Sequence, residues 1–258
     1  MSELVSIITP LFNAEKHIEE TIDSVLAQTY SNWEWNIVDD QSTDSSVSIV
    51  EKYAKIDDRI HLIQNERNSG AAISRNEALK HSNGRFVAYI DSDDLWDPNK
   101  LTVQLKYMQE HQSAFSCASY RVIDEDGHSL GKDVYMRPQV DYKGFLTNNL
   151  LQTIGIVVDL SVVDRKLCIM PNLRRRQDAA TWLQILKNGY VCEGIDEPLG
   201  SYRRTAGSLS SSKVKAVKGV WFLYRQVEHL SLPFSIYCFV RYAFLAVWKR
   251  TYVHQHQE

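Results

Sequence analysis

Short apolar runs alternate with amphipathic segments through the first half of the chain. Apolar runs bounded by polar or turn residues predict buried β-strands, and we expect these at 5–10, 33–38, 60–64 and 86–90. Apolar residues at helical spacing predict helices over 15–27, 44–55, 71–81 and 98–112. This alternation predicts an α/β fold with a parallel, mostly doubly wound sheet. Its ligand crevice should lie outside the carboxyl ends of the strands.

The second half has a less regular pattern. We expect strands at 114–123 and 153–158 and a helix at 179–187. Glu125-Asp126-Gly127 predicts a tight turn that joins the first of these strands to a partner. Two further helical segments, broken at Pro233, are predicted near the end of the chain.

The last apolar segment is a candidate for membrane contact. Between Phe234 and Trp248 only Ser235 and Arg241 are clearly polar. Fifteen helical residues span roughly 22 Å, which is shorter than the ~30 Å hydrocarbon core of a bilayer. Aromatic residues and flanking lysines and arginines favour a helix that lies at a membrane surface through 234–250. A helix that packs on its own domain or on a second subunit remains an equal alternative.

Composition narrows the functional classes. The chain of 258 residues is 44% hydrophobic and 24% charged, which is typical of a folded globular protein. A net charge of −3 provides no basic field for non-specific binding of nucleic acid, so no nucleic-acid partner is expected. Four widely spaced cysteines and an N-terminus without a signal peptide predict a cytoplasmic protein with reduced thiols.

Carboxylates gather where two of the predicted strands end. Asp91, Asp93 and Asp94 fall within four residues after the strand at 86–90, and Asp39-Asp40 end the strand at 33–38. Crowded carboxylates repel one another unless a cation such as Mg²⁺ or Mn²⁺ lies among them. The alternative for Asp91, Asp93 and Asp94 is an acidic loop that caps the next helix. Because the ends of parallel strands converge, we expect both groups and Thr9 to lie together.

Four segments carry a resemblance to a known family. They are Val5–Asn13, Val38–Asp44, Ser69–Asn76 and Asp91–Asp94. In this order and spacing they resemble family 2 glycosyltransferases of the GT-A fold, and most of all the non-processive bacterial enzymes that build surface polysaccharides. The resemblance implies a Rossmann-like, mostly parallel central sheet flanked by helices. It divides residues 1–210 into a nucleotide-binding half, 1–112, and an acceptor-binding half, 113–210, and leaves 211–258 as a C-terminal helical extension.

The resemblance also implies roles for individual residues. Asp93 and Asp91 match the metal-binding acids, with Mn²⁺ or Mg²⁺ as the cofactor, and Asp178 matches the general base although Gln177 replaces the Glu that often precedes it. Other positions match the binding site of a nucleotide-sugar, with UDP as the expected carrier: Thr9, Phe12, Asp39, Asp40, Arg75, Asp91, Ser92, Arg203 and Arg204. An N-cap remains the alternative role for Asp178, and a solvated basic loop the alternative for the two last arginines.

These implications define an expected activity and its alternatives. We expect an inverting, metal-dependent transfer of a sugar from a UDP-sugar to a hydroxyl of a lipid-linked glycan, at the inner face of the cell membrane. A catalytically silent nucleotide-sugar-binding or scaffold protein is one alternative. A sugar nucleotidyltransferase is another, but it would require a Gly-rich basic loop after the first strand, where Leu11-Phe12-Asn13-Ala14 stands. The sequence identifies neither the sugar, the acceptor and the linkage nor the oligomeric state.

Overall fold

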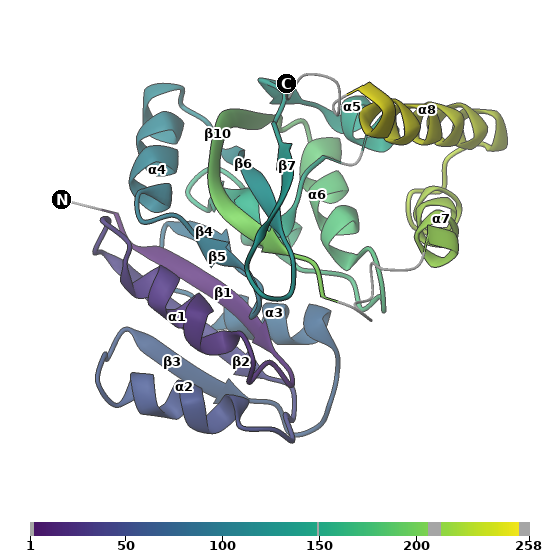
Figure 1. The fold of residues 1–258 in the computed structure, drawn as a ribbon. Coiled ribbons are helices and arrows are strands. Elements are labelled where there is room, and N and C mark those ends of the chain that lie inside the picture. The colour runs from purple at the N-terminus through teal and green to yellow at the C-terminus, as the bar shows by residue number, and fades with distance from the viewer. Residues whose placement is uncertain (1–2, 149, 206–212, 253–258) are drawn as a thin grey trace.

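The computed structural model describes residues 3–148, 150–205 and 213–252, which form one β-sheet between two helical layers, with a helical hairpin beside them (Figure 1). The strands are β1 (Val5–Leu11), β2 (Trp33–Asp39), β3 (Ile60–Gln64), β4 (Phe86–Tyr89), β5 (Leu95–Trp96), β6 (Phe115–Ile123), β7 (Ser129–Val134), β8 (Gln139–Val140), β9 (Ile156–Asp159) and β10 (Cys192–Arg203). The α-helices are α1 (Ile18–Leu26), α2 (Ser46–Ala54), α3 (Ala71–Lys80), α4 (Lys100–Glu110), α5 (Tyr142–Thr147), α6 (Gln177–Lys187), α7 (Lys213–Phe222) and α8 (Leu232–Tyr252). Short helical turns are η1 (Thr153–Gly155), η2 (Arg165–Cys168) and the π-helical η3 (Leu223–Val227).

The sheet has the strand order β3-β2-β1-β4-β9-β6-β10-β5. Strands β3, β2, β1 and β4 are parallel, as are β6 and β10, whereas β9 pairs antiparallel with both β4 and β6. The prediction of an α/β fold with a mostly parallel sheet is therefore confirmed. Each antiparallel pair includes at least one strand from the second half of the chain, because β9, β6 or β10 takes part in all of them.

Side chains of the central strands alternate between two cores. On β1, Ile7 packs with the cluster beneath α1, α2 and α4, whereas Ile8 packs with the cluster beneath α3, α5 and α6. Phe86 and Val87 divide in the same way on β4. This period of two is what a strand buried on both faces requires. The four cysteines are buried and unpaired, as predicted.

Three expected element boundaries are wrong. Residues 153–155 form η1 instead of a strand, because Gly155 lies against the backbone of Ala118, where an added Cβ would be 2.5 Å from the carbonyl oxygen. The helix expected from residue 98 begins at Lys100, because residues 95–96 pair with β10. The break in the C-terminal helices precedes Pro233, which lies in the first turn of α8, where proline is tolerated.

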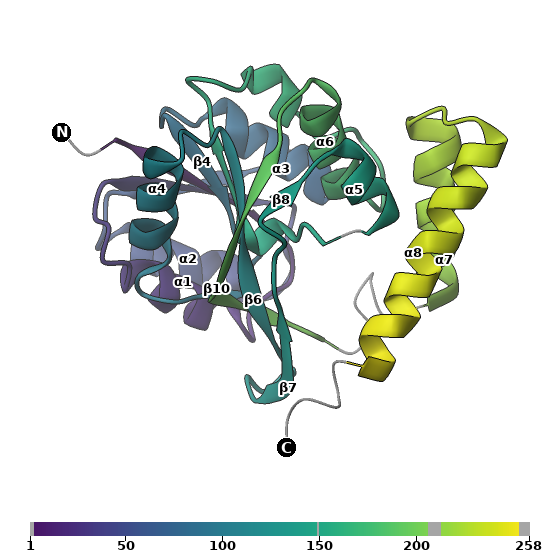
Figure 2. The same cartoon turned by 90° about the horizontal axis from the view of Figure 1, so that it is seen from above.

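The C-terminal hairpin of α7, η3 and α8 is docked on α5 and α6 (Figure 2). Glu228 is buried there, accepting a hydrogen bond of 2.6 Å from the Tyr142 hydroxyl and pairing with Lys187 Nζ at 3.3 Å. The Tyr224 hydroxyl donates to the carbonyl of Leu146. These contacts fix the hairpin relative to α6. Among the described residues, no helix combines the length and the apolar character needed to cross a bilayer.

Candidate active site

The carboxylates at the end of β2 each accept hydrogen bonds from several groups of the protein itself. Asp39 accepts from the backbone N–H groups of Gln41 and Ser42 at 3.1–3.3 Å. Asp40 accepts from the amide of Asn65 and from the backbone N–H groups of Ser69 and Gly70 at 2.7–2.8 Å. Both side chains are buried. They hold the loops that follow β2 and β3, which brings the start of α3 to the site.

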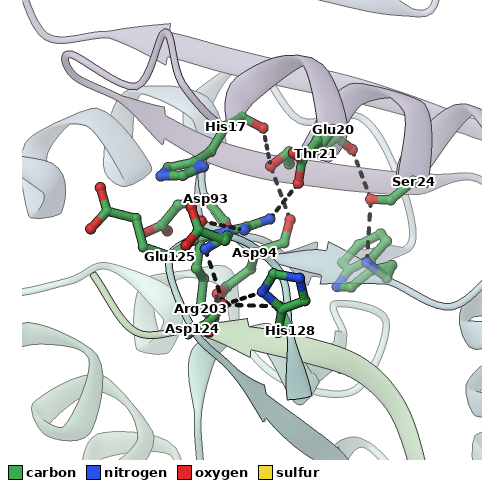
Figure 3. Close-up of polar contacts among 12 residues, drawn as sticks. His17, Glu20, Thr21, Ser24, Asp93, Asp94, Asp124, Glu125, His128 and Arg203 are labelled. Atoms are coloured by element: carbon green, nitrogen blue, oxygen red, sulfur yellow. Dashed lines mark hydrogen bonds and ion pairs between the residues drawn. The ribbon is translucent and has the colours of Figure 1, made fainter. Parts of the chain in front are cut away.

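The carboxylates after β4 have fewer partners. Asp91 accepts from Nη2 of Arg75, and the buried Asp94 accepts from the backbone N–H of Arg203 at 2.9 Å. Burial, and then the charge of Asp91, raises the pKa of Asp93 to about 6. Burial and the charges of Asp93 and Asp91 likewise raise the pKa of Asp94 well above its usual range. Asp93, Asp94 and Arg203 lie close together at this strand end (Figure 3).

Arg75 on α3 lies between this acidic loop and α6. Its residue is only 6% exposed, and its Nε and Nη1 atoms have no hydrogen-bond partner among the described residues. Burial alone would lower the pKa of Arg75, but the charges of Asp91 and Asp178 outweigh it and raise the pKa. The positive charge of the buried Arg75 therefore interacts with both Asp91 and Asp178. Its Nε and Nη1 atoms could donate hydrogen bonds to a ligand.

Thr9 and Phe12 lie at the end of β1 in different ways. Thr9 is buried, donates to the carbonyl of Ile90 at 2.8 Å and accepts from Trp35 Nε1 at 2.9 Å. Its hydroxyl therefore connects β1 to its two neighbouring strands, and a direct contact of Thr9 with a nucleotide stays a prediction. Phe12 is exposed at the edge where these strands end.

Arg203 supports the acidic loop from below. Its fully buried side chain donates from Nε to the Asp93 carbonyl at 2.8 Å, from Nη1 to the Glu125 carbonyl at 2.9 Å and from Nη2 to Glu20 Oε2 at 2.5 Å (Figure 3). These donors are engaged within the protein, and a contact of Arg203 with the nucleotide-sugar stays a prediction. The neighbouring Arg204 is exposed.

Asp178 lies in the first turn of α6, two residues after the N-cap. The N-cap position is held by Arg176, which has the left-handed φ of 64°. The alternative of an N-cap role for Asp178 is therefore wrong. Oε1 of the preceding Gln177 is buried and has no partner among the described residues. Trp182 of the same helix is buried against Tyr89 and Phe115, so it packs the core.

Sequence reasoning missed Glu20 and the cluster of side chains within the predicted turn between β6 and β7. Glu20 lies on the exposed side of α1 and has no pattern that indicates its ion pair with Arg203. In the turn, Asp124 Oδ1 accepts from the backbone N–H groups of Asp126 and His128. Ligand atoms of these three residues lie within 4.8 Å of one another, the one such cluster among the described residues. These residues lie close together because the hydrogen bonds of Asp124 stabilise the turn.

The loop after β4 fits a divalent cation. Asp91 and Asp93 offer oxygen ligands, and burial together with the charge of Asp91 raises the pKa of Asp93, an effect that a bound cation would oppose. Mg²⁺ and Mn²⁺ are held by one or two carboxylates when substrate phosphates and waters complete the coordination. Two carboxylates without a third are therefore consistent with a metal that binds together with a diphosphate.

Two named proteins are similar in sequence to this chain along most of its length. TuaG of Bacillus subtilis, named as a glycosyltransferase of teichuronic acid biosynthesis, is 44% identical over 247 residues, which cover 96% of this chain and 97% of TuaG. WfgD of Escherichia coli, named UDP-Glc:alpha-D-GlcNAc-diphosphoundecaprenol beta-1,3-glucosyltransferase, is 38% identical over 230 residues, or 84% of each chain.

Solved structures show the same fold. Residues 1–349 of S. aureus TarS, in complex with UDP-GlcNAc, match with a TM-score of 0.72 at 22% identity, covering 93% of this chain and 71% of that one. The mannosyltransferase PcManGT from Pyrobaculum calidifontis, in complex with GDP-Man and Mn²⁺, matches with a TM-score of 0.65 at 18% identity, covering 98% and 76%. These similarities confirm the predicted GT-A fold.

The family match covers the strand ends described above. The family described as glycosyl transferase family 2 matches residues 6–161, which is more than half of the chain. Together with relatives more than 30% identical along most of their length, this match shows that the chain belongs to glycosyl transferase family 2 and is a glycosyltransferase.

Proposed function

We propose that the protein transfers a sugar, with inversion, from a UDP-sugar to a hydroxyl of a lipid-linked glycan during synthesis of a bacterial surface polysaccharide. The reaction would take place at the inner face of the cell membrane, which the protein contacts through its C-terminal helices. The name of WfgD includes both a UDP-linked donor and a diphosphoundecaprenol acceptor, and the name of TuaG includes a surface polymer. The complex of TarS with UDP-GlcNAc supports the same carrier.

The observation that carries the proposal is the environment of Arg75. A buried guanidinium with two unpartnered nitrogen atoms loses hydrogen-bonding free energy unless a ligand supplies oxygen atoms. The adjacent carboxylates after β4 favour a cation, and a nucleoside diphosphate satisfies both requirements at once. Binding of a UDP-sugar would therefore explain why Arg75 and the carboxylates after β4 lie side by side although they only partly satisfy one another.

Residues at the carboxyl ends of the strands would hold the nucleotide. Asp39 retains lone pairs that can accept the N3–H of uracil, because a carboxylate offers about four acceptor sites. The exposed ring of Phe12 can pack on the base, while Asp40 fixes the loop around it. Ser92 lies in the acidic loop beside Asp91, where the ribose would bind.

The diphosphate and the metal would lie beyond the ribose. Asp93 and Asp91 would hold Mn²⁺ or Mg²⁺, which neutralises charge on the departing diphosphate. Arg204 is exposed and can extend toward the phosphates, whereas Arg203 positions Asp93 and Asp94 from below. Thr9 keeps the ends of the strands in register.

Asp178 would act as the general base. It removes the proton of the acceptor hydroxyl while the hydroxyl oxygen attacks the anomeric carbon, and the bond from that carbon to the diphosphate breaks with its electron pair leaving on UDP. One displacement of this kind inverts the anomeric configuration. The positive charge of Arg75 interacts with both Asp91 and Asp178 and so would place the base close to the donor.

The test measures UDP release with Mn²⁺ or Mg²⁺, a panel of UDP-sugars and lipid-diphosphate-linked sugar acceptors. We expect Asp178→Asn to lower kcat at least 100-fold while UDP still raises the melting temperature of the variant. Asp58→Asn is the matched control, because Asp58 is exposed before β3, at the opposite edge of the parallel strands. Full activity of Asp178→Asn would exclude the base. Binding of UDP without transfer to any acceptor would instead favour a nucleotide-sugar-binding protein.

A further inference from the structure

Exposed apolar side chains are concentrated on the C-terminal hairpin. Eight of the fifteen large apolar residues that are exposed in the described part of the chain lie within residues 217–244. We define the hairpin face by six of them: Trp221, Phe222, Ile236, Tyr237, Val240 and Phe244. A monomeric protein rarely leaves such a group in water, so this surface is expected to bind something.

The hairpin face is continuous across the two helices. Ile236, Val240 and Phe244 follow one another at intervals of four residues and so form one stripe along α8. The ring of Trp221 on α7 contacts that of Phe239 on α8 edge-on, with centroids 5.9 Å apart. Between the helices lies an open groove of about 500 Å³, which the side chains of Trp221, Phe222 and Phe239 help to line.

Charge on the hairpin has the opposite sign to the rest of the protein. Residues 213–252 contain seven lysines and arginines and one carboxylate, whereas residues 1–212 contain 22 basic and 30 acidic residues. The one carboxylate, Glu228, is buried and paired with Lys187. Lys218 and Arg225 line the groove, and Arg241 is held beside Tyr237 by a hydrogen bond of 3.1 Å.

These features together fit one occupant. Aromatic and aliphatic side chains bordered by cations are the pattern of a helix that lies at an anionic lipid surface. A second copy of the hairpin would bring like charges together. We propose that the hairpin face docks on anionic lipid, with apolar residues in the interface and cations at the headgroups.

The hairpin is also joined to the segment that carries the proposed base. Gly219 of α7 packs on the side chain of Arg176, where an added Cβ would lie 3.4 Å from Cγ. Arg176 directly precedes Gln177 and Asp178, and Glu228 anchors the hairpin to α5 and α6. The lipid-bound face therefore has a fixed position relative to Asp178. In this respect the inference rests on the proposed function, because a lipid-linked acceptor could reach Asp178 without leaving the membrane.

The first experiment is cosedimentation of the full chain with vesicles of phosphatidylglycerol and phosphatidylethanolamine or of phosphatidylcholine alone. We expect about tenfold stronger partitioning to the anionic vesicles, reduced by added salt. Ile236→Glu combined with Val240→Glu should remove at least nine-tenths of this binding. Ile56→Glu combined with Val162→Glu is the matched control, since it adds the same charges at two exposed apolar positions elsewhere. Equal binding of the two double variants would overturn the proposal.

A second measurement does not depend on the folding of a charged variant. Because the native cysteines are buried, a Val240→Cys chain can be labelled with an environment-sensitive fluorophore and compared with Ile56→Cys. We expect anionic vesicles to shift the emission of the label at 240 to shorter wavelength and to leave that at 56 unchanged. No shift at 240, or a shift that depends on protein concentration without lipid, would overturn the proposal; the latter would identify a contact between copies.

Activity separates this inference from the proposed function. With an acceptor embedded in anionic vesicles, the Ile236→Glu/Val240→Glu variant should lose most of its rate, while with a water-soluble short-chain acceptor it should equal the parent. Equal rates on both acceptors would disprove the delivery role. If no sugar transfer occurs with any chain, the proposed function fails, but the vesicle and fluorescence results still decide whether the hairpin face binds lipid.

Discussion

The ends of β2 and β4 both carry clustered aspartates, but the hydrogen-bond environments of these carboxylates differ. Asp39 and Asp40 accept hydrogen bonds from a set of backbone and amide N–H groups, which solvate their charge within the protein. Asp93 gains no comparable set, and burial and Asp91 raise its pKa to about 6. The first pair therefore stabilises loops, whereas the second stores charge that a ligand can neutralise. Sequence alone does not distinguish the two, because the difference lies in which backbone donors reach each carboxylate.

The largest effect is expected when a carboxylate after β4 loses its charge. Asp93→Asn preserves the shape of the side chain and removes its charge. We expect kcat to fall about 10²- to 10³-fold, since charge stabilisation at the leaving group would be lost. The melting temperature of the ligand-free protein should stay the same or rise, because repulsion from Asp91 disappears. Rates measured across a Mn²⁺ titration, with thermal melts beside them, check both parts; an unchanged rate with a lowered melting temperature would place Asp93 with the structural acids.

The parallel half of the fold was predictable because its signals are local. The strands at 33–38 and 60–64 and the helix at 71–81 agree with β2, β3 and α3 to within a residue. Turn residues and apolar periodicity determine these elements within short windows. The second half depends on contacts between distant residues, such as the approach of Gly155 to Ala118, and there the predicted boundaries were less accurate.

The site likewise contains features that could be predicted from the sequence and features that could not. The convergence of Asp39, Asp40 and Asp91 follows from strand order and could be predicted. The burial of Arg203 could not, because its partner Glu20 is 183 residues away and lies on a helix face that looks solvated. The resemblance implied a basic residue at this position without indicating whether it contacts phosphate or supports the loop.

A smaller effect is expected when a hydrogen-bonded carboxylate at the end of β2 is removed. Asp40→Ala leaves the N–H groups of Ser69 and Gly70 and the amide of Asn65 without their acceptor. We expect the free energy of unfolding to fall by about 3 kcal/mol, because hydrogen bonds to a charged acceptor contribute more than neutral ones. Urea denaturation measures this value. Asp58→Ala should change it by less than about 0.5 kcal/mol, and a loss of activity without a loss of stability in Asp40→Ala would contradict its structural role.

Lys100, a buried lysine that follows the acidic loop after β4 in the sequence, is a further case in which burial shifts a pKa. Nζ contacts Gln104 Oε1 at 3.0 Å and lies 4.0 Å from the ring centroid of Trp96, and burial lowers the pKa to about 7. Between pH 7 and 10.5 the unfolded chain binds one more proton at this residue than the folded chain. Stability should therefore rise with pH across this window.

Replacement of Lys100 by methionine should remove that dependence. We expect Lys100→Met to raise the free energy of unfolding by about 2 kcal/mol at pH 7, because the cost of burying the amine disappears. The advantage should shrink toward pH 10. Urea denaturation of parent and variant at pH 7, 8.5 and 10 follows the difference; an advantage that grows with pH would show that the folded protein keeps Lys100 charged.

The smallest expected effect concerns Asp44, which like Asp40 accepts several hydrogen bonds from the protein. Its carboxylate accepts from the backbone N–H of Glu15 at 3.0 Å and from the hydroxyl of Ser46 at 2.5 Å. Burial opposes ionisation, but hydrogen bonds from Ser46 and Glu15 outweigh it and lower the pKa below 3.8. Asp44→Ala should cost about 1 kcal/mol at pH 7. Because the folded pKa is depressed, the contribution is complete above pH 5 and is lost as the pH falls through the folded pKa. Parent and variant should therefore converge in stability toward pH 3 in urea titrations, whereas a constant difference would show that Asp44 acts through packing and not through its charge.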